Sequence, residues 1–325
     1  AEMKYFEEDY LLVDTENLVG KQDKPDASSH HQMTADMRVA KTDDPDTIIA
    51  YLTKENNIAQ VKAALVLGIR DYFSKMGFKK AILGSSGGID SAVVSTLCAE
   101  TGLPTYVLSM PLHSSSTNDT LSDDYTDYLE KKYDNVTKIR IDLTSVYDQL
   151  ISSFDYWTGS GELTLNNLAN ANTKSRIRMV TLYQVAGNVG GIVVGTGNKV
   201  EDYGVGFYTK YGDGGVDIAP IADLYKTEVW ELGKYLGVDR RIIEAPPTDG
   251  LWEDSRTDED QIGASYELLE WVMESEIIDS SYDPETLTMW MGKELTEEHK
   301  SAIRQYKKFN TQNKHKMLSI PTFKL

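Results

Sequence analysis

The chain has 325 residues, enough for one large domain or two small ones, and 40% of them are hydrophobic, which can fill a substantial core. Its 33 Lys and Arg against 51 Asp and Glu give a net charge of −18, which disfavours nucleic acid and membranes as partners because no basic patch is segregated. Cys98 is the single cysteine, which excludes an intrachain disulfide, and no apolar run is long enough for a membrane span. We therefore expect a cytoplasmic protein.

The first part of the chain differs from the rest in composition. Residues 1–45 are polar and unrepetitive, which predicts an extended or poorly ordered arm. Helical spacing of apolar residues begins after Pro45 and continues to Phe73. We therefore place one large domain at residues 46–325.

Beyond this helical region, compact apolar runs alternate with helical patterns. Strands are predicted at 80–84, 105–110, 136–143 and 191–195, and helices up to about 100, at 119–133, from 145 and at 174–189. This alternation predicts an α/β fold with a doubly wound parallel sheet flanked by helices. Ligands of such sheets lie at the carboxyl ends of the strands, so the loops at 84–91, 109–116 and 196–201 should converge there. After Tyr225 the pattern is mostly helical, with one long loop at 245–257 of a length typical of functional lids.

The loop after the first strand is rich in glycine and serine. It reads Gly84-Ser85-Ser86-Gly87-Gly88-Ile89-Asp90-Ser91. Adjacent glycines let the backbone approach a ligand, the serines add hydroxyl donors, and the next helix offers its positive N-terminal end, all of which suits phosphate. No Gly-Lys-Ser/Thr ends the loop, so it is not a Walker A motif; Asp90 instead suits Mg²⁺ beside bound phosphates. An ordinary tight turn is the alternative, but the full pattern favours phosphate binding.

This loop resembles the pyrophosphate loop of the N-type ATP pyrophosphatases. That superfamily cleaves ATP between the α and β phosphates, so the resemblance implies adenylation of a substrate. It also implies an adenine nucleotide α-hydrolase-like fold, in agreement with the predicted parallel sheet.

A second group of motifs lies between Asn172 and Thr227. It comprises Arg176-Ile177-Arg178-Met179, Gly195-Thr196-Gly197-Asn198-Lys199-Val200-Glu201, Thr209-Lys210-Tyr211-Gly212-Asp213-Gly214-Gly215-Val216-Asp217 and Pro220-Ile221-Ala222-Asp223-Leu224-Tyr225-Lys226-Thr227. With these motifs in this order, the chain from about residue 46 to its end resembles NAD synthetase. The resemblance implies a ligase of NAD biosynthesis that amidates deamido-NAD to NAD through an acyl-adenylate. ATP and ammonia are then co-substrates, and AMP and pyrophosphate are products.

The implied reaction places clear demands on the site. A nicotinate carboxylate must attack the α-phosphate of ATP although both groups are anionic, so metal ions, cations and aligned dipoles have to neutralise them. Asp90 and Glu201 each follow a predicted strand and match Mg²⁺-binding positions of the family. Lys226 matches a position that contacts the ATP phosphates. We therefore expect Asp90 and Lys226 to be catalytic and Asp90 and Glu201 to hold the metal.

The remaining site residues come from the resemblance alone. Thr196 matches a position that contacts the nucleotide, and Thr248 matches one that contacts the ATP phosphates. Positions that hold deamido-NAD are matched by Arg176, Lys210, Asp217, His315 and Lys316. Because His315 and Lys316 lie near the C-terminus, the resemblance also implies a homodimer whose site is shared between subunits.

The chain departs from the family's pattern in two places. Leu168 stands where some relatives carry an aromatic residue that stacks on the nicotinate ring, which puts that stacking in question. Met317 follows Lys316 where the family tail often has arginine, so one cationic contact is lost.

Other functions compete with this interpretation. Residues 5–14 resemble the last strand of a glutaminase domain, so the chain could be the synthetase portion of a glutamine-dependent enzyme; Cys98 lacks the surroundings of a nucleophile, however, and we expect ammonia as donor. The 172–227 motifs disfavour GMP synthetase, and the net charge and the absence of a cysteine pair disfavour tRNA thiolation. A nucleotide-binding protein without catalysis is disfavoured by the intact candidate metal and phosphate ligands.

Overall fold

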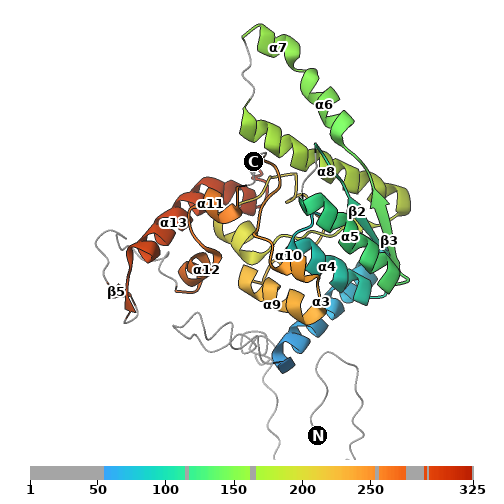
Figure 1. Ribbon diagram of the computed structural model, residues 1–325, viewed down its shortest axis with the longest axis horizontal. Helices are drawn as coiled ribbons and strands as arrows, with labels where there is room; N and C mark the ends of the chain where they lie inside the picture. The colour runs from blue at the N-terminus through green and yellow to red at the C-terminus, as the bar shows by residue number, and fades with distance from the viewer. Residues whose placement is uncertain are drawn as a thin grey trace, which may run out of the picture.

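The computed structural model describes residues 55–113, 117–161, 166–252, 256–275, 289–290 and 293–323 (Figure 1). The arm predicted for residues 1–45, and its boundary with the domain, lie outside these ranges. Four parallel strands form the central sheet in the order β3 (Val136–Arg140), β2 (Thr105–Ser109), β1 (Ala81–Ser85) and β4 (Ile192–Val193). The predicted doubly wound parallel sheet is therefore confirmed.

Helices precede, separate and follow the strands. The helices of the sheet region are α3 (Glu55–Met76), α4 (Ile89–Glu100), α5 (Thr117–Lys132), α6 (Thr144–Ser152), α7 (Asp155–Gly159) and α8 (Asn167–Val189). They are followed by the π-helix η2 (Lys199–Val205), then α9 (Lys226–Leu236), α10 (Arg240–Ile243), α11 (Asp258–Ile262), α12 (Tyr266–Glu274) and α13 (Glu297–Met317). A small antiparallel pair, β5 (Met289–Trp290) and β6 (Lys293–Glu294), precedes α13.

The alternation of side chains along the strands creates two cores, one on each face of the sheet. Ala81 and Leu83 point into a core shared with α3, α4, α5 and α9, whereas Ile82 points into a core shared with α6 and α8. This two-sided burial explains why the strands read as continuous apolar runs rather than as alternating patterns.

A third core lies beside the sheet and joins η2 to the C-terminal helices. Val200 and Val205 of η2 pack there with Leu269 of α12 and Ile303 of α13, all of them buried. Figure 1 shows α11, α12 and α13 as a group on the side of the molecule opposite β3. Helices α12 and α13 are thus packed against η2, the next element after β4.

One helix boundary was predicted wrongly. The helix expected at 174–189 begins at Asn167, because the Asn166 side chain accepts a hydrogen bond from the backbone of Leu168 and caps it. The first turns of this helix are rich in asparagine and have few apolar residues, so the spacing of apolar residues does not indicate a helix there. The other end agrees with the prediction, and Gly190 closes it with a left-handed φ of 72°.

Candidate active site

The glycine- and serine-rich loop links β1 to α4 at the carboxyl edge of the sheet. Its shape is held by its own hydroxyls: Ser91 Oγ lies 3.1 Å from Ser86 Oγ and donates to the Gly88 carbonyl at 3.0 Å. Gly87 has a φ of 81°, a conformation that favours glycine. Gly88 precedes α4 without a side-chain cap, so the helix presents backbone N–H donors to an incoming anion.

A buried lysine forms the centre of the site. Lys226 is only 3% exposed, and its Nζ lies 2.6 Å from Asp90 Oδ2 and 2.9 Å from Glu201 Oε1. It occupies the first position of α9, where the helix dipole disfavours a cation, so the two carboxylates must stabilise its charge. Removing three charged groups from water costs free energy, so this buried ion group is more readily explained by function than by stability.

Asn198 connects the two carboxylates. Its fully buried side chain donates from Nδ2 to Asp90 Oδ1 at 3.2 Å, and its Oδ1 accepts from the backbone N–H groups of Val200 and Glu201 at 3.1 Å each. The same asparagine therefore caps η2 and holds the loop after β1. Through it, the ends of β1 and β4 are fixed relative to each other.

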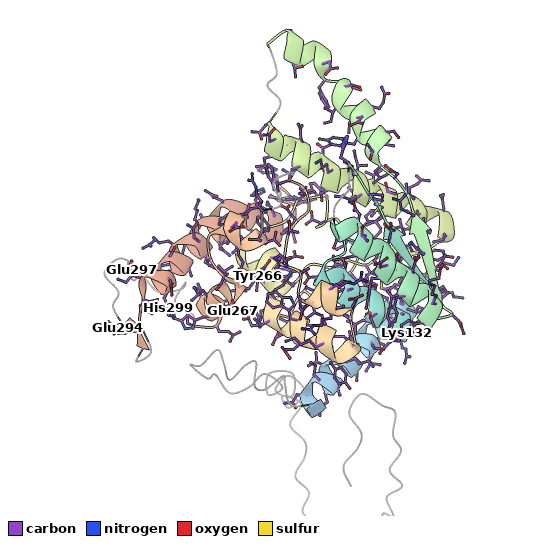
Figure 2. All side chains as sticks on the ribbon, viewed as in Figure 1. Lys132, Tyr266, Glu267, Glu294, Glu297 and His299 are labelled. Carbon is purple, nitrogen blue, oxygen red and sulfur yellow. The ribbon has the colours of Figure 1, made fainter. Side chains whose placement is uncertain are left out.

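Tyr266 approaches the same centre from α12. Its hydroxyl donates to Glu201 Oε1 at 2.7 Å, and Lys226 Nζ lies 5.1 Å from the centre of its ring. Trp230 of α9 packs against the ring edge-on, with centroids 5.9 Å apart. Figure 2 shows Tyr266 in the interior, where the α11–α13 group meets the rest of the molecule.

Burial and charge act on the ionisation of this centre in opposite directions. Burial and the neighbouring Glu201 raise the pKa of Asp90 above its usual value, although Lys226 opposes them. Burial would also raise the pKa of Glu201, but Lys226 and the Tyr266 hydroxyl outweigh it and lower that pKa. The two carboxylates in turn raise the pKa of Lys226, which overcomes its burial. Lys226 therefore stays charged and keeps Glu201 ionised.

The donors present fit a metal that binds together with phosphate. Asp90 and Glu201 both contact Lys226 Nζ, so their carboxylates face one small space. Within the described ranges, no three His, Cys, Asp or Glu side chains gather closely enough to hold an ion by themselves. Mg²⁺ is typically held by one or two carboxylates together with substrate phosphates and water. The pair therefore suits Mg²⁺ carried in by a nucleotide.

Thr248 and Thr196 lie at the borders of this region. The Thr248 hydroxyl donates to the Arg256 carbonyl at 3.1 Å and accepts from Gly250 N at 3.2 Å. It thereby closes the neck of the long loop predicted between α10 and α11. Thr196 follows β4 and is partly buried, next to the Asn198 cap.

Four of the five candidate substrate residues gather at one place. Arg176 Nε donates to the Lys210 carbonyl at 3.3 Å, and Lys210 Nζ donates to the His315 carbonyl at 2.7 Å. Lys316 Nζ donates to the carbonyls of Gly206 and Tyr208 of its own chain, each at 2.8 Å. The C-terminal tail thus meets the 206–210 segment of the same chain.

Asp217 lies apart from that group, at the side of β4. Its Oδ2 accepts from Val193 N at 2.7 Å, and its Oδ1 accepts from the Tyr183 hydroxyl at 3.1 Å. Both oxygens therefore have a donor in this chain. Leu168 is 57% exposed in the first turn of α8.

Three residues of the site were missed by sequence reasoning. Asn198 was part of a recognised motif, and its place before an acidic helix start is a capping signal that could have identified it. Tyr266 and Asp258 gave no such signal. Tyr266 reaches Glu201 only because α12 packs against η2, a contact that no local pattern predicts, and Asp258 of α11 lies next to the Tyr266 hydroxyl.

Comparisons with known proteins agree with this architecture. The NAD synthase family profile matches residues 61–319. The NH(3)-dependent NAD(+) synthetases of Sulfolobus acidocaldarius and Methanococcoides burtonii are 38% and 39% identical over 67% of this chain, and the matches cover 74% and 80% of those proteins.

Solved structures give the same result. The NMN synthetase of Francisella tularensis superposes with a TM-score of 0.68 at 28% identity, covering 82% of this chain and 99% of that one. An NH3-dependent NAD synthetase of Campylobacter jejuni, in complex with nitrate, superposes with a TM-score of 0.60 at 25% identity over the same shares of the two chains. The predicted fold and the predicted resemblance are both confirmed: the chain belongs to the NAD synthase family.

Proposed function

We propose that this chain amidates deamido-NAD to NAD, with ATP and ammonia as co-substrates and AMP and pyrophosphate as products. The observation that carries the proposal is the buried Asp90–Lys226–Glu201 centre beside the glycine- and serine-rich loop, in a chain whose curated relatives are named NH(3)-dependent NAD(+) synthetases. Such a centre suits anionic reactants that must meet.

The first step joins the nicotinate carboxylate to the α-phosphorus of ATP and breaks the bond to pyrophosphate. The N–H groups at the start of α4 and the ammonium of Lys226 bind the phosphate oxygens and lower the repulsion between the reactants. Asp90 and Glu201 would hold Mg²⁺, which would supply positive charge to neutralise the phosphate oxygens. In this role Lys226 turns from the carboxylates towards the nucleotide.

The second step replaces AMP by nitrogen. Ammonia attacks the acyl carbon of the adenylate, the C–O bond to AMP breaks, and a proton leaves the nitrogen to give the neutral amide. AMP is the leaving group that the free carboxylate lacked. The site must exclude water during this step, because water would hydrolyse the adenylate back to deamido-NAD.

Arg176, Lys210, His315 and Lys316 are proposed to hold deamido-NAD. Their clustering supports this role, since three cations and a histidine suit an anionic dinucleotide. Asp217 is proposed to contact the substrate from beside β4, and Thr196 and Thr248 to contact ATP.

The proposal is tested by measuring pyrophosphate release with each candidate substrate and donor. Ammonium chloride should support NAD formation and glutamine should not, and omission of either ATP or deamido-NAD should stop pyrophosphate release. Efficient use of glutamine by this chain would contradict ammonia as the donor.

A second acceptor substrate should be compared with deamido-NAD in the same assay. The Francisella protein is named an NMN synthetase and superposes well with this chain. Nicotinate mononucleotide is therefore the second acceptor substrate to test. Deamido-NAD is preferred because the curated relatives named NAD(+) synthetases are more similar in sequence. A higher kcat/KM for the mononucleotide would reverse this assignment.

We also propose that the chain forms a homodimer. Large apolar side chains remain exposed on and beside α6 and on α8: Val146, Leu150, Phe154, Leu168, Val180 and Tyr183. A second copy that covers them would bury the unpartnered side of α8, whose other side packs on the sheet.

None of the helices in the described part of the chain has the length and apolarity needed to cross a bilayer.

We further propose a cytoplasmic location. Cys98 is fully buried, and burial raises the pKa of its thiol to about 12, so it is an inert core residue that needs no oxidising compartment.

A further inference from the structure

Two residues link the C-terminal helices to Glu201, and the proposed reaction does not use either of them directly. Tyr266 is completely buried, and its hydroxyl lies 2.7 Å from Glu201 Oε1. Asp258, at the start of α11, is 6% exposed, and its Oδ2 lies 3.4 Å from the same hydroxyl. Asp258 Oδ1 has no hydrogen-bond partner among the described residues.

The direction of these two contacts follows from the proton count. A tyrosine hydroxyl has one proton, and the shorter distance assigns it to Glu201. The phenol oxygen can still accept, so Asp258 stabilises this arrangement only when it carries a proton and donates. Burial and the charge of Glu201 raise the pKa of Asp258 to about 7, although Lys226 opposes them, so a large share of this carboxyl carries a proton at neutral pH.

We propose that Asp258 and Tyr266 are positioning residues that fix Glu201 for the metal through two hydrogen bonds in series. Asp258 donates to Tyr266, and Tyr266 donates to Glu201. This inference rests on the proposed function, because it assumes that Glu201 holds Mg²⁺.

The geometry explains how fixing Glu201 helps. Tyr266 and Lys226 both bind Oε1, which would leave the second oxygen, Oε2, available to a metal when Lys226 turns to the phosphates. After that turn, Tyr266 is the donor that still holds Oε1 in place. Hydrogen bonds to a metal ligand typically change metal affinity 10- to 100-fold.

The same residue pair also connects the metal ligand to the long loop. The backbone N–H of Asp258 donates to the Pro247 carbonyl at 3.0 Å, next to the candidate phosphate ligand Thr248. The neck of the loop and the orientation of Glu201 therefore depend on one residue. A purely structural role for Tyr266 is the alternative, since its ring also packs against Trp230.

Metal affinity distinguishes these two roles. Mn²⁺ binding is measured by electron paramagnetic resonance in the presence of a non-hydrolysable ATP analogue. Tyr266→Phe keeps the ring and removes the hydroxyl, and it should weaken Mn²⁺ binding about ten-fold. The matched control is Tyr235→Phe on the exposed side of α9, which should leave Mn²⁺ affinity unchanged.

Variants of Asp258 test the second hydrogen bond. Asp258→Asn can still donate from its amide and should bind Mn²⁺ within two-fold of the unsubstituted chain. Asp258→Leu keeps the branched shape of the side chain without a donor and should weaken binding several-fold. Because the two residues act in series, Asp258→Leu should cause little further loss in the Tyr266→Phe background.

The outcomes are separable. If Tyr266→Phe lowers the melting temperature but leaves Mn²⁺ affinity unchanged, Tyr266 is structural and the inference is wrong. Additive effects of Tyr266→Phe and Asp258→Leu would overturn the series arrangement. If the unsubstituted chain binds no Mn²⁺ with the nucleotide, the proposed metal role of Glu201 fails, and the inference fails with it.

Discussion

At the scale of single residues, the site is organised by one cation and two carboxylates. Lys226, Asp90 and Glu201 were all identified from motifs, because each lies in a short recognisable stretch of sequence. Their joint geometry was not predictable, since Lys226 reaches Asp90 across 136 positions of the chain. Only the packing of α9 against α4 brings them together.

Replacement of the candidate metal ligands should stop the chemistry. Asp90→Ala is expected to reduce pyrophosphate release by at least about 100-fold, because phosphate repulsion is then poorly neutralised. Glu201→Gln should be nearly as damaging, since a neutral amide is a weaker Mg²⁺ ligand. Steady-state assays at saturating Mg²⁺ measure both effects. Turnover within a few-fold of the unsubstituted chain, with an intact fold, would show that the metal is held elsewhere.

Glu270 gives a prediction about pH and stability. Burial raises the pKa of its carboxyl to about 7, although Thr227 donates to it from both its backbone and its hydroxyl. Between about pH 4.5 and 7 the unfolded chain has lost this proton while the folded chain retains it, so Glu270 lowers the free energy of unfolding as pH rises through that window. Above the window the penalty persists in full.

Glu270→Gln should remove this penalty. The melting temperature of the variant relative to the unsubstituted chain should rise between pH 5 and 7 and then level off. Glu298→Gln on the exposed side of α13 changes the net charge equally and serves as the control. If the difference in melting temperature between the variant and the unsubstituted chain stays constant or falls between pH 5 and 7, the raised pKa of Glu270 is contradicted.

At the scale of elements, the sheet and most of its helices were predictable because their signals are local. The strands are short apolar runs, and the helices beside them have regular apolar spacing. The association of η2 with α12 and α13 was not predictable, because it depends on a third core whose members are far apart in sequence. Asp258 and Tyr266 were missed for this reason.

The contact between β1 and β4 offers a test at this scale. A Cβ at Gly191 would lie 2.6 Å from the Lys80 carbonyl oxygen, which accepts the first hydrogen bond of β4. Gly191→Ala should therefore lower the free energy of unfolding by about 1–3 kcal/mol through overpacking and loss of pairing. Gly68→Ala in α3 meets no atom within 4 Å and should be neutral or stabilising by up to about 1 kcal/mol. Denaturant titrations giving equal stabilities for the two variants would contradict this account.

At the scale of the whole molecule, the exposed apolar side chains of α6 and α8 predict a homodimer. Light scattering should give twice the chain mass of 36.4 kDa at micromolar concentration. Val180→Glu, which adds a charge to the middle of this surface, should shift the population towards monomer. Leu67→Glu changes an exposed leucine of α3 and should leave the mass unchanged. A monomer with full activity in the unsubstituted chain would rule out a shared site.

The central claim is that the carboxylate of deamido-NAD is activated as an acyl-adenylate. Deamido-NAD labelled with ¹⁸O in its nicotinate carboxylate, incubated with the chain, ATP, Mg²⁺ and ammonium, tests it directly. Attack on the α-phosphorus followed by C–O cleavage predicts that one labelled oxygen appears in AMP and the other remains in the amide of NAD. Unlabelled AMP, or formation of ADP and labelled phosphate, would contradict the account.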